Sequence, residues 1–148
     1  MPAQTLTPQE VQELFTTNPA AVYIDVRTVA EFASGHPRLK KIVNVPIVFH
    51  HPTTKETYPN KSFLEVIESL YAKDTPLIIG CDGGERAGLA VTLLSQAGYT
   101  NVCFMAEGHP GWRAQKLPTT TDNRDGISYV SLLTPVKRKG KKKTAAHA

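Results

Sequence analysis

Residues 76–90 read PLIIGCDGGERAGLA, and this stretch decides the fold class. A short, very apolar run ends at Gly80, and a polar loop that contains two glycines follows it. From Leu89 onward, apolar residues recur at helical spacing as far as Gly98. A buried strand, a loop and a helix in direct succession are typical of an α/β domain with a parallel sheet.

The rest of the chain repeats this alternation of short apolar runs and helical patterns. Strands are expected at three further apolar runs, residues 21–26, 42–45 and 101–105. Thr7 and Thr28 each stand three residues before a glutamate, which predicts a capped helix after each of them. Helical spacing over residues 63–71 predicts another helix, with Asn60 as its cap. Residues 46–60 contain three prolines and are expected to form a loop.

Length and composition describe one ordinary folded domain. The chain has 148 residues, of which 41% are hydrophobic and 20% charged, so it can bury a core. No apolar run reaches the roughly 18 residues that a membrane helix needs, and no secretory signal is expected at the start. Two cysteines do not make a disulfide scaffold or a metal site, which favours a reducing, cytoplasmic location.

The net charge of +4 belongs to the end of the chain. Residues 137–143 hold six of the 17 basic residues, and the remaining 11 face 13 acidic ones. The folded domain is therefore not expected to bind nucleic acid or a membrane, whereas residues 137–148 are expected to be a disordered basic tail. Such a tail can bind a polyanion or an import factor, which makes a nuclear location possible. Before it, residues 119–136 form an extension whose segment 127–133 is either a small extra strand or a partner-binding segment.

The loop at Cys81 carries the chemistry. Its backbone N–H groups and the start of the following helix create positive potential, which should lower the pKa of the Cys81 thiol and favour the nucleophilic thiolate. Gly83 and Gly84 permit the tight loop, and Arg86 can hold an anionic group through paired hydrogen bonds. A lone cysteine is otherwise most often a small buried hydrophobe. That structural interpretation is the one we give to Cys103, which lies inside an apolar run.

Four motifs in order resemble the single-domain type of rhodanese-like sulfurtransferase. The loop is similar to the family's Cys-x-x-Gly-x-Arg pattern, with Cys81, Gly84 and Arg86 in place. The other three motifs are Asp25-Val26-Arg27 with Glu31-Phe32 and Gly35-His36, then Asn44-Val45-Pro46, then Gly108 and Trp112 with Leu117-Pro118. The resemblance runs from about residue 6 to residue 118.

The resemblance implies a fold and a reaction. The fold would be a three-layer α/β domain over residues 1–118, with a central, mainly parallel five-stranded sheet flanked by helices. The Cys81 thiolate would take a sulfane sulfur from a donor such as thiosulfate, become a persulfide, and pass the sulfur to cyanide or a thiol. No metal or organic cofactor is implied.

The resemblance also assigns roles to individual residues. The active-site loop and substrate-binding residues would be Asp82, Gly83, Gly84, Glu85 and Arg86. The supporting residues would be Asp25, Arg27, Glu31 and His36, with Asp25 and Arg27 paired to each other or to Glu31. Glu107, which stands where the family has a glycine, and His109 would lie at the rim of the pocket. The negative charges of Asp82 and Glu85 are expected to oppose thiosulfate.

Two other functions fit the same residues. The first is a phosphatase or arsenate reductase of this fold, whose loop by resemblance has five residues between cysteine and arginine; here four lie between Cys81 and Arg86. The second is a non-enzymatic binding or regulatory module, although family members of that kind usually lack the cysteine. Sulfur transfer is therefore the leading hypothesis.

Overall fold

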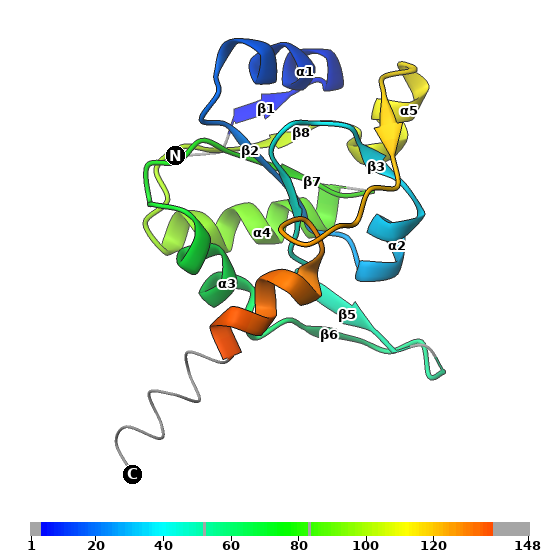
Figure 1. Ribbon diagram of the computed structural model, residues 1–148, viewed down its shortest axis with the longest axis vertical. Coiled ribbons are helices and arrows are strands. Elements are labelled where there is room, and N and C mark those ends of the chain that lie inside the picture. The colour runs from blue at the N-terminus through cyan, green and yellow to red at the C-terminus, as the bar shows by residue number, and fades with distance from the viewer. Residues whose placement is uncertain (1–3, 52, 83, 138–148) are drawn as a thin grey trace.

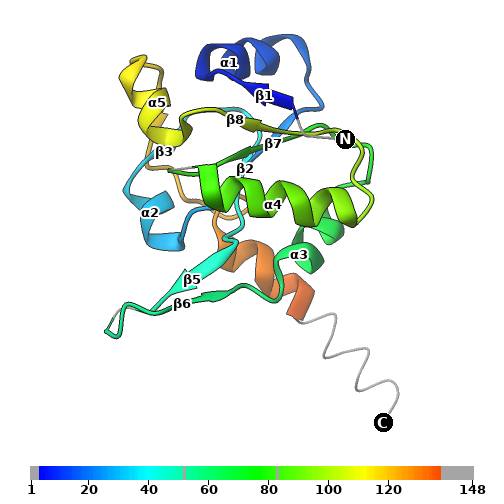
Figure 2. The ribbon, with the colours of Figure 1, turned by 180° about the vertical axis from the view of Figure 1, so that it is seen from behind.

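A five-stranded parallel sheet forms the centre of the protein. The computed structural model describes residues 4–51, 53–82 and 84–137. The strand order is β1-β8-β7-β2-β4, and each neighbouring pair is parallel. Figures 1 and 2 show the strands from two opposite directions, as a layer between helices. The strands are β1 (Gln4–Leu6), β2 (Val22–Asp25), β4 (Ile42–Asn44), β7 (Leu77–Gly80) and β8 (Val102–Met105). The predicted five-stranded α/β fold is confirmed.

Helices cover both faces of this sheet, which gives three layers. Side chains alternate between the faces along β7: Ile78 packs with one set of helices, and Leu77 and Ile79 with the other. The first set comprises α1 (Pro8–Thr17), α2 (Val29–Ser34) and α5 (Gly108–Ala114). The second comprises α3 (Phe63–Leu70), α4 (Gly84–Gln96) and the helical residues 129–137.

Local capping explains where two of the helices begin. The backbone N–H of Glu10 donates to the Thr7 hydroxyl at 3.1 Å, and the Glu10 carboxylate accepts from the Thr7 N–H at 2.9 Å. Thr28 and Glu31 form the same reciprocal pair at the start of α2. Both predicted capping boxes are therefore confirmed.

The segment between β4 and α3 differs from the predicted loop. It contains an antiparallel hairpin, β5 (Val48–His50) and β6 (Thr57–Pro59), which projects from the body of the molecule in Figure 1. Asn60 is not the helix cap, because Ser62 occupies that position without a side-chain hydrogen bond. Asn60 instead donates through Nδ2 to the carbonyl oxygen of Pro46 and to the hydroxyl of Tyr129.

The sequence did not predict the first strand of the sheet, nor a second, two-residue strand pair outside it. β1 is only three residues long and lies at the edge of the sheet, paired with β8 alone. β3 (His36–Pro37) pairs antiparallel with β9 (Thr119–Thr120). The β3–β9 pairing joins the beginning of the extension, at Thr119, to the segment that follows α2.

The extension after residue 118 joins the core of the domain. The possible strand over residues 127–133 is wrong, because residues 129–137 are helical. Buried Tyr129, Leu132 and Val136 pack in the same cluster as α3 and α4. The predicted disordered tail falls mainly on residues 138–148, outside the described part of the chain, and Lys137 before them is helical. No helix among the described residues is both long and apolar enough to cross a membrane.

Candidate active site

Cys81 lies at the carboxyl edge of the sheet, directly after its middle strand. Parallel pairing places Asp25, Asn44 and Gly80 side by side at this edge. Cys81 follows Gly80, is 1% exposed, and is separated from α4 by the loop. A Cβ on Gly80 would come within 1.7 Å of the Tyr23 hydroxyl oxygen, so the strand must end on glycine here. In open α/β sheets ligands bind at this edge.

The start of α5 packs against the backbone of Cys81. The His109 N–H donates to the Cys81 carbonyl oxygen at 2.8 Å. A Cβ on Gly108 would lie 2.0 Å from that same oxygen, and the φ of Gly108 is +58°, so only glycine fits between these two segments. One backbone hydrogen bond and one close backbone approach therefore join Cys81 to the start of α5.

Asp25 and Arg27 form a buried ion pair beneath the site. Arg27 Nη2 lies 2.8 Å from Asp25 Oδ2, and Arg27 Nη2 also donates to the Gly35 carbonyl oxygen. Asn44 Nδ2 donates to the backbone carbonyls of Asp25 and Arg27. Burial raises the pKa of Asp25, and the paired Arg27 opposes that rise. The predicted pairing of Asp25 with Arg27 is confirmed.

Glu31 pairs with Arg86, which lies in the first turn of α4 rather than in the loop, and not with Arg27. Arg86 donates from Nη1 and Nη2 to the two carboxylate oxygens of Glu31 at 2.7 and 3.1 Å. This bidentate pair holds the pKa of Glu31 far below its usual value, against the opposing effect of burial. A guanidinium has five N–H groups, and among the described residues two of those of Arg86 are used, which leaves three for another acceptor.

Asp82 and Glu85 occupy different environments. The Asp82 side chain is 41% exposed and lies 3.5 Å from Arg27 Nη1. Burial raises the pKa of Asp82, and the neighbouring Glu31 adds to the rise. Glu85 is exposed in the first turn of α4. Gly84 begins that helix, and Gly83 lies outside the described residues.

Neither His36 nor Glu107 lines the small cavity beside the Cys81 loop that is described below, so the structure does not place Glu107 at the rim predicted for it. The His36 ring is buried, stacks on Phe32 with a centroid distance of 3.8 Å, and has Nε2 2.7 Å from the Asp122 carbonyl oxygen. This environment matches the supporting role predicted for His36. Glu107 has a left-handed backbone (φ +65°), and its Cβ packs close to Gly111. Glu107 thus occupies a position that suits the glycine expected by resemblance.

A small cavity adjoins the Cys81 segment. Its volume is about 220 Å³, and its lining brings together predicted residues from three motifs. The lining residues are Arg27, Glu31, Ser34, Gly35, Asp82, His109, Arg113 and Thr119. The sequence analysis did not predict Arg113 as a site residue. Its position four residues after His109 on a short helix could have indicated that the two side chains share a face. Thr119 comes from the extension and had no local signal.

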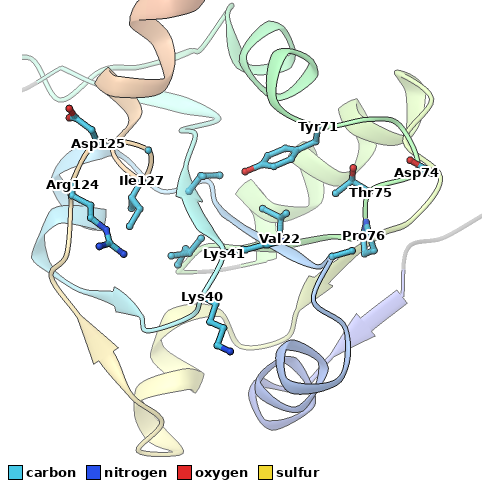
Figure 3. A pocket seen from close by; sticks show the side chains of 14 residues that line it. Val22, Lys40, Lys41, Tyr71, Asp74, Thr75, Pro76, Arg124, Asp125 and Ile127 are labelled. Carbon is cyan, nitrogen blue, oxygen red and sulfur yellow. The ribbon is translucent and has the colours of Figure 1, made fainter.

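Larger cavities lie away from the Cys81 loop. One of about 650 Å³ opens at the amino ends of β2, β4 and β7, the opposite edge of the sheet (Figure 3). There Arg124 and Ile127 of the extension face Tyr71 and Pro76. Another, of about 830 Å³, adjoins it beside the buried His36 ring. Neither of these cavities is lined by a residue of the active-site loop, so the largest cavities do not mark the candidate active site.

Comparison with known proteins agrees with this arrangement. Residues 7–115 match the rhodanese-like domain family. The chain is 35% identical over 103 residues to thiosulfate sulfurtransferase 18 of Arabidopsis thaliana, covering 70% of this chain and 74% of that protein. It is 38% identical over 96 residues to senescence-associated protein DIN1 of Raphanus sativus, covering 65% of this chain. The chain spans only 50% of the length of that relative.

A solved structure supports the same assignment. The crystal structure of Rv0390 from M. tuberculosis matches with a TM-score of 0.68 at 27% identity, covering 82% of this chain and 100% of that one. The family match includes the Cys81 loop, the Asp25–Arg27 pair and all of α5. The chain therefore belongs to the rhodanese-like domain family.

Proposed function

We propose that the protein is a sulfurtransferase that carries sulfur as a persulfide on Cys81. The observation that carries the proposal is the position of Cys81, at the carboxyl end of the middle strand and at the entrance to α4, with Arg86 in that helix. Positive potential at the start of a 13-residue helix favours a thiolate and the anions it reacts with. The name of the Arabidopsis thaliana relative supports thiosulfate as a donor.

The reaction has two displacement steps. The Cys81 thiolate attacks the outer sulfur of thiosulfate, an S–S bond forms at Sγ, and sulfite leaves with the electron pair of the broken bond. Cyanide or a thiolate then attacks the outer sulfur of the persulfide, and the electron pair returns to Cys81 Sγ. The protein ends unchanged, so no external oxidant or reductant is needed.

The residues around Cys81 divide the remaining work. Arg86 is already oriented by Glu31, so its free N–H groups can hold a donor without a large loss of side-chain entropy. Backbone amides at the start of α4 would stabilise charge on the bound sulfur. Arg27 and Asp25 fix the wall next to Asp82 and take no part in bond making.

Intact-protein mass spectrometry tests this proposal. Brief exposure to thiosulfate should add the mass of one sulfur atom to the wild type and to Cys103→Ser, and cyanide should remove it. Cys81→Ser should gain nothing. Cys103 is the matched control because it is also buried, one strand away on β8, where burial raises the pKa of its thiol to about 11.

The other outcomes point to the alternative functions. Sulfur gained by Cys81→Ser would contradict the mechanism. If no donor loads the wild type, hydrolysis of a phosphate ester by the wild type and not by Cys81→Ser would favour the phosphatase alternative. Absence of both activities would favour a binding module.

A further inference from the structure

Two side chains of α5 line the small cavity and have no partner among the described residues. His109 is 5% exposed, and its Nδ1 atom is buried without a hydrogen-bond partner. Arg113, one helical turn later, is exposed, lines the same cavity and has no hydrogen bond or ion pair from its side chain within the described ranges. A buried polar atom left unsatisfied costs free energy. This wall of the cavity is therefore suited to a polar ligand.

The other charged groups of the cavity are already paired. Glu31 holds Arg86, and Arg27 holds Asp25 and approaches Asp82. These three acidic and two basic groups leave the site acidic on its Asp82 side, and Arg113 is the additional cation. A ligand with one negative charge at one end matches this distribution better than a compact dianion.

His109 contributes a neutral ring. Burial, with the positive charges of Arg27 and Arg113, lowers the pKa of His109 to about 4. At neutral pH the ring therefore offers a hydrogen bond and no charge. The volume of about 220 Å³ lies below the roughly 300 Å³ of the smallest drug-sized sites, so the ligand must be small.

We propose that this cavity binds the sulfur acceptor, and that the acceptor is a small thiol carrying a carboxylate. Arg113 pairs with the carboxylate, His109 hydrogen-bonds to it, and the thiol end faces the Cys81 loop, whose backbone is bonded to His109. The inference rests on the proposed function. The acceptor thiolate attacks the outer sulfur of the persulfide, the bond from that sulfur to Cys81 Sγ breaks, and Cys81 leaves as the thiolate. The product is the persulfide of the acceptor.

The kinetic test compares acceptors on the sulfur-loaded protein. The rate of sulfur loss from Cys81 is measured by mass with 3-mercaptopropionate, 2-mercaptoethanol and cysteamine at equal thiolate concentration. We expect Arg113→Gln to lower the ratio of the 3-mercaptopropionate rate to the 2-mercaptoethanol rate by about tenfold. Arg113→Lys should restore part of that ratio. Lys61→Gln, which removes an exposed charge that does not line the cavity, should leave the ratio unchanged.

A binding test keeps the inference separate from the proposed function. The NMR signal of the His109 ring is followed in unloaded protein as 3-mercaptopropionate or 2-mercaptoethanol is added. A shift with 3-mercaptopropionate alone, lost in Arg113→Gln, supports the subsite even if thiosulfate loads no sulfur and the proposed function fails. A rate ratio that Arg113→Gln leaves unchanged in loaded protein, or an unshifted His109 signal, would overturn the inference.

Discussion

Two arginine–carboxylate pairs lie within one site but differ in exposure. Asp25 and Arg27 are 1% and 3% exposed, with 2.8 Å between Oδ2 and Nη2. Glu31 and Arg86 are 31% and 27% exposed, with 2.7 Å between Oε1 and Nη1. The chemistry and the distances are nearly the same. The difference lies in what surrounds each pair: the first is buried and its Arg27 Nη2 also donates to the Gly35 carbonyl oxygen, whereas the second borders solvent at the start of α4.

This difference separates a structural role from a binding role. A buried pair that loses one partner leaves an uncompensated charge, which strongly destabilises the fold. A half-exposed pair is screened by water and contributes little to stability, but its arginine can still reach a ligand. We therefore expect the first pair to control folding and the second to control donor use.

The largest effect should come from breaking the buried pair. Asp25→Asn leaves the Arg27 guanidinium buried without a carboxylate, and we expect the free energy of unfolding to fall by about 3–5 kcal/mol. Urea denaturation at pH 7 measures it. Asp122→Asn, which breaks the exposed 3.3 Å pair with Arg124, is the control and should change stability by less than about 0.5 kcal/mol. If the free energy of unfolding fell by the same small amount in Asp25→Asn and Asp122→Asn, burial would not make the Asp25–Arg27 pair important for stability.

Breaking the exposed pair from the arginine side should mainly affect activity. Arg86→Ala removes the charge-assisted hydrogen bonds proposed for the donor. The lost transition-state stabilisation should be about 1.5–3 kcal/mol, which lowers kcat/KM for thiosulfate roughly 10–150-fold. Stability should fall by less than about 1.5 kcal/mol because the pair borders solvent. Lys61→Gln serves as the charge control in steady-state assays. An unchanged kcat/KM would make Arg86 a structural residue like Arg27.

Acid titration tests the same pair from the carboxylate side. Because Arg86 lowers the pKa of Glu31 in the folded state, the pair stabilises the fold fully above the unfolded value of about 4.3, and that contribution is lost as the pH falls further. Glu31→Gln keeps an oxygen for the capping box at Thr28. We expect it to cost about 1 kcal/mol at pH 7 after allowance for screening, and less at pH 3.

Urea denaturation of the wild type and of Glu31→Gln at pH 7 and pH 3 measures how the difference in their free energies of unfolding shrinks in acid. Glu68→Gln is the control, because Glu68 forms an exposed ion pair with Lys73. Its difference from the wild type should stay small at both pH values. A cost of Glu31→Gln that grows in acid would contradict the assigned direction of the pKa.

The sequence predicted the elements that local rules determine. The capping boxes at Thr7 and Thr28, and the apolar strand before Cys81, depend on residues within a few positions of one another, and all three are confirmed. β1 was missed because its three residues, two of them exposed, carry no periodic signal and depend on β8 for their pairing. The helical residues 129–137 were misjudged for a similar reason, since the burial of Tyr129 depends on Asn60, far away in the chain.

The site shows the same limit. Motif spacing identified Asp25, Arg27, Glu31 and Arg86. The Asp25–Arg27 pair was predicted, but the pairing of Glu31 with Arg86 was not. Asp25 and Arg27 are two residues apart, so their contact is local. Glu31 and Arg86 are 55 positions apart and meet only because β2 and β7 are neighbours in the sheet. Long-range pairing of this kind follows from strand order, which the single sequence does not contain.

The smallest effect concerns Asp82, which lies between the two pairs. It is 3.5 Å from Arg27 and lines the cavity next to Glu31, so its charge faces an approaching anion. Removing one like charge at a partly exposed site is worth about 1 kcal/mol, and Asp82→Asn should raise kcat/KM for thiosulfate about fivefold. Glu85→Gln removes the same charge from an exposed position outside the cavity and should change it less than about twofold, because water and salt screen that charge. Steady-state assays at low and high salt separate the two, since high salt should abolish the small Glu85 effect and leave most of the Asp82 effect. Equal gains in both variants would mean that the anion senses the overall charge of the loop, and the distinction between enclosed and exposed carboxylates would then not extend to catalysis.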